Sequence, residues 1–224
     1  MASFDVYDTL SNLTTASEWL RGKKQSFLPV FIDPDHTWVD RRTKIRGLTI
    51  IFPGCVFLGK TKIGKRCVIY PNTTLVNTIV GDGAEVSIPV IKNSVIGKQC
   101  KIGATAELNR ATLGRRVSVK HHSFLGDTRI GDETNIGAGT ITANYDGSGK
   151  KQTRIGKGAF TGIHSSIVAP RAIGKEAMTG AGAIITKGIP PHAVIVGLNK
   201  KLHGRSFHKT KTGWEIRKKS GKPT

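Results

Sequence analysis

Three histidines are the residues of this sequence best suited to acid–base or metal chemistry: His121 and its neighbour His122, and His164 further along the chain. A histidine titrates at a pKa of about 6.5, so near neutral pH it can remove a proton from an amine. Three histidines are also a ligand set of catalytic zinc sites. Residue type alone does not distinguish a general base from a zinc site. The distinction depends on the elements that position these side chains.

A second group of candidate residues lies in a polar, glycine-rich segment at residues 143–154, ANYDGSGKKQTR. The apolar pattern resumes on either side of it, so we expect a loop that projects from a regular structure. Such loops often carry functional residues. Lys150 in this loop has two interpretations, a phosphate ligand or an ordinary solvated lysine.

The regular structure around this loop has a period of six residues. The first apolar run with this spacing is Ile45, Ile51, Phe57, Ile63, Ile69 and Leu75. Gly often follows the apolar residue directly, as at Ile63-Gly64 and Ile102-Gly103. A period of six is neither that of an α-helix nor that of an alternating strand. It is typical of a triangular coil with three flat sides and glycine at tight corners, where a Cβ would clash.

We therefore predict an all-β fold, a left-handed parallel β-helix of hexapeptide repeats. The run from Ile45 to Ile185 has room for about seven or eight coils of about eighteen residues. A β-sandwich fits less well, because its turns are not spaced by six. Three interruptions are expected: residues 76–95, which lose strict register, the loop at 143–154, and the chain from Leu198 onwards.

These features divide the chain into residues 1–40, with a short helix and a segment leading into the coil, residues 41–197, the β-helix, and residues 198–224, a basic tail. Thr15 is the expected N-cap of the helix, and Glu18 completes a capping box. The tail has nine Lys or Arg and one Glu. It is either a solubilising tail, a lid over cofactor phosphates or a nucleic-acid arm.

The composition limits the cellular setting and the partners. The net charge of +20 over 224 residues suits any polyanion, including nucleic acid and coenzyme A. No apolar run approaches the roughly 20 residues of a membrane span, and no secretory signal is visible. Cys55, Cys67 and Cys100 form neither a disulfide framework nor a CxxC metal site. We expect a cytoplasmic protein with no membrane contact.

Several motifs resemble one family, the acetyltransferase domain of the bifunctional N-acetylglucosamine-1-phosphate uridyltransferases. The most specific is residues 135–146, NIGAGTITANYD, and the similarity extends back through residues 121–127, HHSFLGD. Residues 31–40, FIDPDHTWVD, also resemble the segment that leads into the β-helix of that family. The resemblance covers roughly residues 30 to 190.

The resemblance implies an acetyl-CoA-dependent N-acetyltransferase that acts on an amino sugar phosphate similar to glucosamine-1-phosphate. Acetyl-CoA is the expected co-substrate, and no metal is expected. Members of the family are trimers whose active sites lie between neighbouring prisms, so we expect a homotrimer. Because the sequence has no Gly-rich nucleotide-binding segment, we expect no uridyltransferase activity.

Five residues match functional positions of the family. His121 matches the catalytic base, which would take the proton of the acceptor amine, with His122 as second choice. Asn135 matches a position near the sugar. Asn144 and Tyr145 match residues that contact substrate and cofactor, and we assign Asn144 to the substrate and Tyr145 to the cofactor. Lys150 matches a basic loop residue on the substrate side.

The remaining candidate positions belong to the cofactor. Ala138 and Ala181 match small residues that let the coenzyme A arm lie against the coil, although packing alone also explains them. Ile163 stands where the family has a cofactor-binding Ser. A late cofactor-binding Arg is replaced by Leu198, and Lys200 is the nearby basic residue that we assign in its place.

On the substrate side the sequence departs from the family. Asn109 replaces a phosphate-binding Lys, and Phe124 replaces a Tyr beside the catalytic His. A Leu-Arg-Pro-Gly step that binds the sugar phosphate is missing, so the identity of the acceptor stays open. The residues that could bind its phosphate instead are Lys92, Arg110, Arg115, Arg116 and Lys120.

Two other functions remain open. A trimer that retained the fold without the chemistry would act as a scaffold for a polyanion; nucleic acid is not favoured as that polyanion, because aromatic residues are few in the basic tail. A zinc enzyme of the γ-class carbonic anhydrase kind would use His121, His122 and His164 across a trimer interface. The loop at 143–154 has no role in that chemistry.

Overall fold

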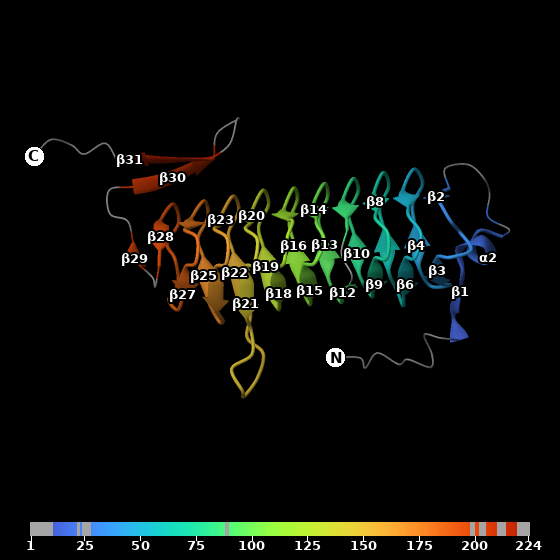
Figure 1. Cartoon of the computed structure of the whole chain (residues 1–224), viewed down its shortest axis with the longest axis horizontal. Coiled ribbons are helices and arrows are strands. Elements are labelled where there is room, and N and C mark those ends of the chain that lie inside the picture. Colours follow the sequence, from blue (N-terminus) through green and yellow to red (C-terminus); the bar gives the residue numbers. More distant parts are fainter. Residues whose placement is uncertain are drawn as a thin grey trace, which may run out of the picture.

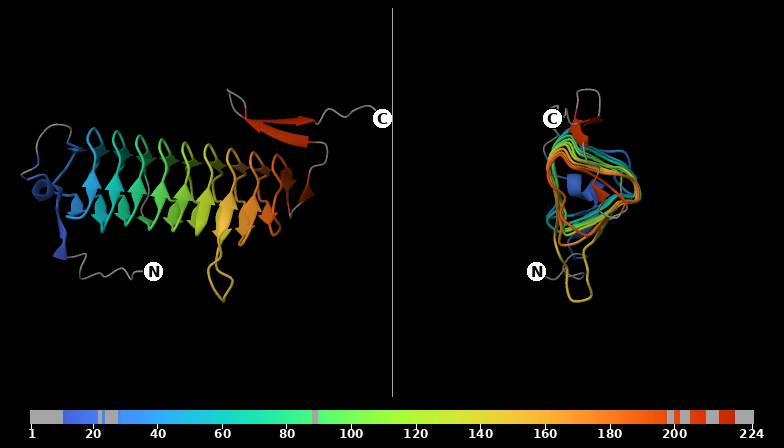
Figure 2. Two further views of the ribbon diagram at one scale, coloured as in Figure 1. Left: turned by 180° about the vertical axis from the view of Figure 1, so that it is seen from behind. Right: turned by 90° about the vertical axis from the view of Figure 1, so that its left-hand side faces the viewer.

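The protein is a parallel β-helix with a triangular cross-section, as the computed structural model shows from the side in Figure 1 and end-on in Figure 2. The structure describes residues 11–21, 23, 28–87 and 90–197, and the backbone of residues 200–201, 205–209 and 214–218. The chain passes repeatedly over three flat faces, here called C, B and A in the order in which it crosses them. The turns between them are the CB, BA and AC corners.

Face A is a sheet of parallel strands that stack in chain order, one from each coil. Its strands are β3 (Trp38–Asp40), β6 (Val56–Leu58), β9 (Thr74–Val76), β12 (Val90–Lys92), β15 (Glu107–Asn109), β18 (Phe124–Gly126), β21 (Ile141–Ala143), β24 (Ser166–Val168) and β27 (Ile184–Ile185).

Face B has the same order of parallel strands. Its strands are β2 (Val30–Phe31), β5 (Ile50–Ile51), β8 (Val68–Ile69), β11 (Glu85–Val86), β14 (Lys101–Ile102), β17 (Ser118–Val119), β20 (Asn135–Ile136), β23 (Phe160–Thr161), β26 (Met178–Thr179) and β28 (Val194–Val196). Face C is formed by β4 (Lys44–Ile45), β7 (Lys62–Ile63), β10 (Ile79–Val80), β13 (Val95–Ile96), β16 (Thr112–Leu113), β19 (Thr128–Ile130), β22 (Thr153–Ile155) and β25 (Ala172–Ile173).

The core is the narrow interior of the prism, and one apolar residue of most strands points into it. Phe57, Leu75, Ile91, Leu108 and Leu125 lie in register on successive strands of face A and are fully buried. The coils cannot bury these side chains alone, so stacking is what stabilises each of them. The predicted all-β, left-handed parallel β-helix is thus confirmed.

The expected loss of strict register at residues 76–95 is present as a shorter coil, but it does not interrupt the strand pairing. β10, β11 and β12 pair with the coils before and after them, so the stack is continuous there. Leu75 lies over Phe57, eighteen residues on, whereas Ile91 lies over Leu75 after only sixteen. This coil is two residues shorter, which shifts the six-residue count without breaking the hydrogen-bonded ladder.

The two other departures from the repeat are present. Between β21 and β22 the chain leaves the stack as a long loop, seen projecting from the prism in Figure 1. After β28, β29 (Lys200–Lys201) turns back antiparallel to it, and β30 (Arg205–Lys209) pairs with β31 (Trp214–Lys218) as an antiparallel ribbon. The basic tail therefore forms strands outside the repeat.

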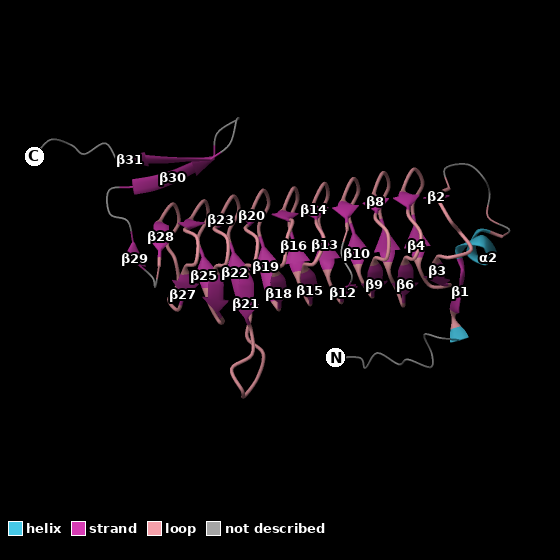
Figure 3. Ribbon diagram, in the orientation of Figure 1, coloured by secondary structure: helices cyan, strands magenta, loops and turns pink. Residues whose placement is uncertain are grey.

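The N-terminal end closes the prism with the short helix α2 (Ala16–Leu20), coloured cyan in Figure 3. The Thr15 hydroxyl accepts a hydrogen bond from the Glu18 backbone N–H at 3.2 Å, as the predicted N-cap requires. The Glu18 carboxylate accepts from the Thr14 hydroxyl instead of completing the capping box. β1 (Leu13–Thr15) pairs antiparallel with β3, which attaches this cap to face A.

Candidate functional site

Four of the predicted site residues form a column along the BA corner: His121, Ala138, Ile163 and Ala181, one from each of four successive coils. Backbone hydrogen bonds tie the column together. The N–H after Ala138 donates to the His121 carbonyl at 3.1 Å, the N–H after Ile163 to the Ala138 carbonyl at 2.7 Å, and the N–H after Ala181 to the Ile163 carbonyl at 2.8 Å.

Glycines make this edge of the prism flat. A Cβ on Gly162 would lie 2.5 Å from the carbonyl carbon of Gly180, and one on Gly137 would clash with the Thr161 carbonyl oxygen. Gly139 has a φ of +69°, a conformation that glycine adopts without a steric penalty. Apart from the exposed side chain of Ile163, the part of the column beyond His121, here called the strip, is therefore backbone and small side chains, against which an extended ligand could lie.

His121 stands at the start of this strip with its side chain exposed to solvent. Its carbonyl oxygen accepts from the Ser123 hydroxyl at 3.0 Å, which fixes the backbone. His122 follows at a φ of 45°, and its N–H donates to the Thr105 hydroxyl at 3.3 Å. No hydrogen bond joins the His121 ring to another residue within the described ranges, so the ring is available for a ligand.

Two predicted substrate residues lie on the faces that meet at the BA corner. Asn135 is half-buried on face B, where it pairs in register with Ser118. Phe124 is half-buried on face A, and its ring covers Gly126, where a Cβ would lie 2.9 Å from the ring. The Asn144 amide nitrogen occupies the other side of the same space, 2.5 Å from that Cβ position.

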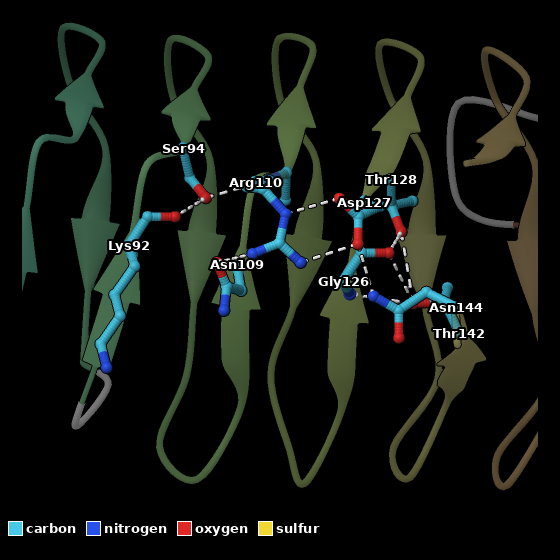
Figure 4. A network of polar contacts seen from close by, with 10 residues as sticks. Lys92, Ser94, Asn109, Arg110, Gly126, Asp127, Thr128, Thr142 and Asn144 are labelled. Atoms are coloured by element: carbon cyan, nitrogen blue, oxygen red, sulfur yellow. Dashed lines mark hydrogen bonds and ion pairs between the residues drawn. The ribbon is translucent and has the colours of Figure 1, made fainter. Parts of the chain in front are cut away.

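Asn109 and Asn144 lie at the AC corner, around a partly buried ion pair (Figure 4). Arg110 donates two hydrogen bonds to the Asp127 carboxylate, at 2.6 and 2.8 Å. The Asn144 side-chain amide donates to the same carboxylate at 2.5 Å. Arg110 also donates to the Asn109 side-chain oxygen at 2.9 Å. Asp127 therefore holds Asn144 directly and Asn109 through Arg110.

This geometry lowers the pKa of Asp127, because hydrogen bonds from Arg110, and then from Asn144, favour the ionised carboxylate over the effect of burial. The sequence analysis did not select Asp127. The signal was present, however: opposite charges seventeen residues apart, one coil in this stack, at the same corner position.

The loop begins at Asn144, the residue whose side chain binds Asp127 of this ion pair. The Lys151 N–H donates to the Asn144 carbonyl at 2.7 Å, and Tyr145 and Lys150 form an antiparallel bridge. The Asp146 carboxylate accepts hydrogen bonds from Ser148 and Gly149, which lower its pKa to about 2 and hold the tip in one shape. The Tyr145 side chain is 64% exposed, a high value for an aromatic ring.

The candidate phosphate-binding residues differ in whether an acidic side chain already forms an ion pair with them. Arg110 is committed to Asp127, Arg115 binds Asp132 at 2.8 Å, and Arg116 binds Glu133 at the CB corner. In the described part of the chain, no ion pair or hydrogen bond engages the ammonium group of Lys92 at the AC corner or that of Lys120 beside His121, although the Lys92 carbonyl accepts from the Ser94 hydroxyl. These two lysines are the ones that remain for an anion.

Within one chain the predicted site residues thus fall on two edges of face A. His121 and the strip lie on the BA corner, and Asn109, Asn144, Tyr145 and Lys150 lie on the AC corner or its loop. Lys200 lies in β29, and its side chain is outside the described part of the structure. Within the described ranges of the single chain, His121, His122 and His164 do not belong to any group of three metal-binding side chains.

The three cysteines are not candidates for the chemistry of the site. Cys55, Cys67 and Cys100 are free and buried in the core, and burial is the main cause that raises the pKa of Cys55 and Cys100 to about 11. A buried thiol with a raised pKa is inert as a nucleophile. Among the described residues, no helix is long and apolar enough to cross a membrane.

The chain is similar in sequence to bifunctional GlmU proteins. The bifunctional protein GlmU of Rubrobacter xylanophilus is 41% identical over 183 residues, which cover 74% of this chain and 39% of the relative. GlmU of Mycobacterium sp. strain KMS is 37% identical over 208 residues, covering 85% of this chain and 40% of the relative. The chain therefore spans about two fifths of the length of these relatives. No family model matches it.

Solved structures support the fold. UDP-N-acetylglucosamine acyltransferase from Campylobacter jejuni has a TM-score of 0.65 at 16% identity, covering 74% of this chain and 71% of that chain. The enzyme of that name from Francisella novicida has a TM-score of 0.57 at 18% identity, covering 73% and 66%. At these identities the likeness shows the left-handed β-helix alone.

Proposed function

Because this chain is a homologue of the C-terminal acetyltransferase region of the bifunctional GlmU proteins, we propose that it transfers the acetyl group of acetyl-CoA to an amino sugar phosphate. The observation that carries the proposal is the column of His121, Ala138, Ile163 and Ala181 along one corner. An exposed base stands at one end of a flat strip that can hold an extended cofactor.

In this reaction the amine nitrogen attacks the carbonyl carbon of the thioester. The new C–N bond forms, the C–S bond breaks, and a ring nitrogen of His121 takes the amine proton and passes it to the leaving sulfur. Holding the two substrates in line can supply about 7–11 kcal/mol of the barrier. The chain therefore needs few catalytic side chains, and no metal is part of the proposal.

The proposal includes a homotrimer. If face A of each of three prisms is turned towards a common three-fold axis, the BA corner of one copy lies beside the AC corner of the next. His121 and the strip of one copy would then face Asn144, Tyr145 and Lys150 of its neighbour. Apolar side chains on face A support this arrangement, among them Trp38, Ile141, Val168 and Ile184, which are exposed in the single chain.

A cytoplasmic location is also part of the proposal. It rests on the three free cysteines, which are typical of a reducing compartment. The absence of uridyltransferase activity remains an expectation from the sequence, to be checked with UTP and N-acetylglucosamine-1-phosphate as substrates.

The first test is calorimetric titration of the protein with acetyl-CoA. Micromolar binding that persists at about 0.3 M salt indicates a shaped groove, because ionic contacts between exposed charges are largely screened there. Binding that disappears with salt, and that any polyanion reproduces, would instead support a polyanion scaffold.

The second test is acetyl transfer to glucosamine-1-phosphate, measured by release of the free thiol of coenzyme A. His121→Ala should lower kcat about a hundredfold to ten-thousandfold, as for other general bases, and leave acetyl-CoA affinity within about threefold. His122→Asn is the matched control, since Asn tolerates the positive φ of that position. Equal losses in both variants, or none in His121→Ala, would remove His121 from the mechanism.

A further inference from the structure

Face C, which lies away from His121 and the strip, carries two hollows on its later coils. The larger, of about 540 Å³, extends across β16, β19, β22 and β25 to the CB corner. The smaller, of about 490 Å³, lies between the base of the projecting loop and β25. Arg154 lines both hollows, so together they form one continuous surface, here called the basic surface.

The lining of the basic surface is strongly cationic. Its one acidic residue is Asp132, and its six basic residues are Arg129, Lys150, Lys151, Arg154, Arg171 and Lys175. Asp132 already binds Arg115 at 2.8 Å, outside the hollows, and Lys175 forms an ion pair with Glu176 at 3.4 Å. The lining therefore keeps a large excess of positive charge.

Two arginines lie side by side in the middle of this surface. Arg129 and Arg154 are register partners on β19 and β22, so their backbones are about 4.8 Å apart, and both side chains are exposed. Like charges at such positions repel each other. Within the described ranges no ion pair or hydrogen bond engages the Arg129 guanidinium, and that of Arg154 donates to the Gln152 amide oxygen at 3.3 Å. Each guanidinium can bind a carboxylate through two parallel hydrogen bonds.

The same outward column becomes apolar in the coils before the arginines. From Arg129 it continues through Thr112 to Val95 and Ile79, which are 39% and 42% exposed. The column from Ile79 to Arg154 is about 19 Å long, at about 4.8 Å for each strand spacing. Apolar side chains beside charged ones are typical of protein interfaces, in which an apolar centre adjoins a polar rim.

A nucleic acid would use such a face differently. Single strands bind through cations together with aromatic rings on which the bases stack, and no aromatic residue lines either hollow. A phosphate backbone also gains nothing from covering Val95 and Ile79. The combination of arginines and apolar side chains therefore favours a protein over a nucleic acid.

We propose that face C is a docking surface for a partner protein, whose acidic side chains bind Arg129 and Arg154 and whose apolar side chains cover Val95 and Ile79. A second copy of this chain does not fit, because across a two-fold axis the arginines of one copy would face those of the other. These residues lie on a different face from His121 and from the face assigned to the trimer axis, so this docking goes beyond the proposed function.

The experiment is fluorescence anisotropy on the full-length protein with two labelled probes, polyglutamate and a copolymer of glutamate and leucine. The copolymer should bind more tightly, because it alone can also cover the apolar part of the column. Arg129→Gln combined with Arg154→Gln should weaken binding of both probes about tenfold or more, the effect of losing charged hydrogen bonds.

The matched control is Lys44→Gln combined with Lys62→Gln, which removes the same charge from the other end of the same column. This variant should bind both probes within about twofold of the wild type. The tail at residues 198–224 has its nine Lys or Arg in every variant, so any binding by the tail is common to all of them. Equal losses in the two double variants would show that net charge alone governs binding and would overturn the proposal.

Val95→Ser tests the apolar part of the surface independently of charge. It should weaken binding of the copolymer about threefold or more and leave polyglutamate binding unchanged. Tighter binding of oligothymidylate than of the copolymer, lost in the arginine double variant, would assign the surface to nucleic acid instead of a protein. Acetyl transfer by the arginine double variant should equal that of the wild type, so failure of the docking surface is distinct from failure of the proposed function.

Discussion

At the scale of single residues, Asp127 is the side chain on which the AC corner depends. Its carboxylate accepts from Arg110 and from Asn144, and Arg110 in turn holds Asn109. Asn144 is buried where the loop begins, so its amide has few other partners within reach. Asp127 is accordingly a positioning residue: it determines how the loop leaves the prism.

Replacement of Asp127 by Asn should lower the free energy of unfolding by about 1–3 kcal/mol. Breaking a fully buried ion pair costs about 3–5 kcal/mol, and this pair is 17–18% exposed, so screening reduces the loss. Urea denaturation measures it, with Asp35→Asn, an exposed aspartate, as the control of equal charge. An unchanged midpoint in Asp127→Asn would show that the pair does not stabilise the corner.

The stabilisation by Asp127 should also depend on pH. The folded pKa is lowered below the unfolded value of about 3.9, so the contribution is complete above that value and disappears as the pH falls through the folded pKa. The difference in unfolding free energy between wild type and Asp127→Asn should thus be largest near pH 6 and shrink towards pH 2. A difference that is constant over this range contradicts the assignment.

The sequence predicted His121 and the residues of the strip from residue type and motif, and the structure places them in one column. The sequence did not predict that Arg110, Arg115 and Arg116 form ion pairs with carboxylates one coil away. Those pairs depend on which corners lie next to each other in the stack. The coil spacing of sixteen to eighteen residues becomes known only from the strand register.

At the scale of elements, the close approach of successive coils is the feature that shapes the strip. The six-residue period predicted the three faces, since every face repeats one buried apolar residue and one tight corner. The same period also indicated the loss of register at residues 76–95, but not that the strands stay paired through a coil two residues shorter. The repeat predicts strands better than it predicts corners.

Gly162→Ala should therefore destabilise the stack by about 1–3 kcal/mol, the usual cost of overpacking, because its Cβ would lie 2.5 Å from the Gly180 backbone. Gly149→Ala in the loop is the control, since a Cβ there has no atom within 4 Å. Thermal denaturation compares the two variants. Equal midpoints would mean that the coils can separate without cost.

At the scale of the whole molecule, face A is bordered by both groups of predicted site residues. One outward column of this face runs through successive coils as Val56, Thr74, Val90, Glu107, Phe124, Ile141, Ser166 and Ile184, so most but not all of its members are apolar. Burial of such a face against other copies would bring the two groups together. The single chain alone keeps them on separate edges.

Ile141→Glu should accordingly dissociate the proposed trimer and abolish acetyl transfer, because it places a charge in the buried interface. Ile79→Glu on face C is the matched control: Ile79 is 42% exposed and Ile141 is 44% exposed in the single chain. Sedimentation velocity gives the mass of each variant. A trimer that survives Ile141→Glu and dissociates in Ile79→Glu would place the interface on face C.

In the described part of the chain, each inner strand of the prism pairs with the strands of the coils before and after it. Loss of a terminal coil breaks the pairs on one side, whereas opening of a middle coil breaks them on both sides. Amide protons should therefore exchange with solvent fastest at the two ends and slowest near the coil of His121. A molecule that begins to unfold from its ends in this way keeps its reactive corner intact until a late stage.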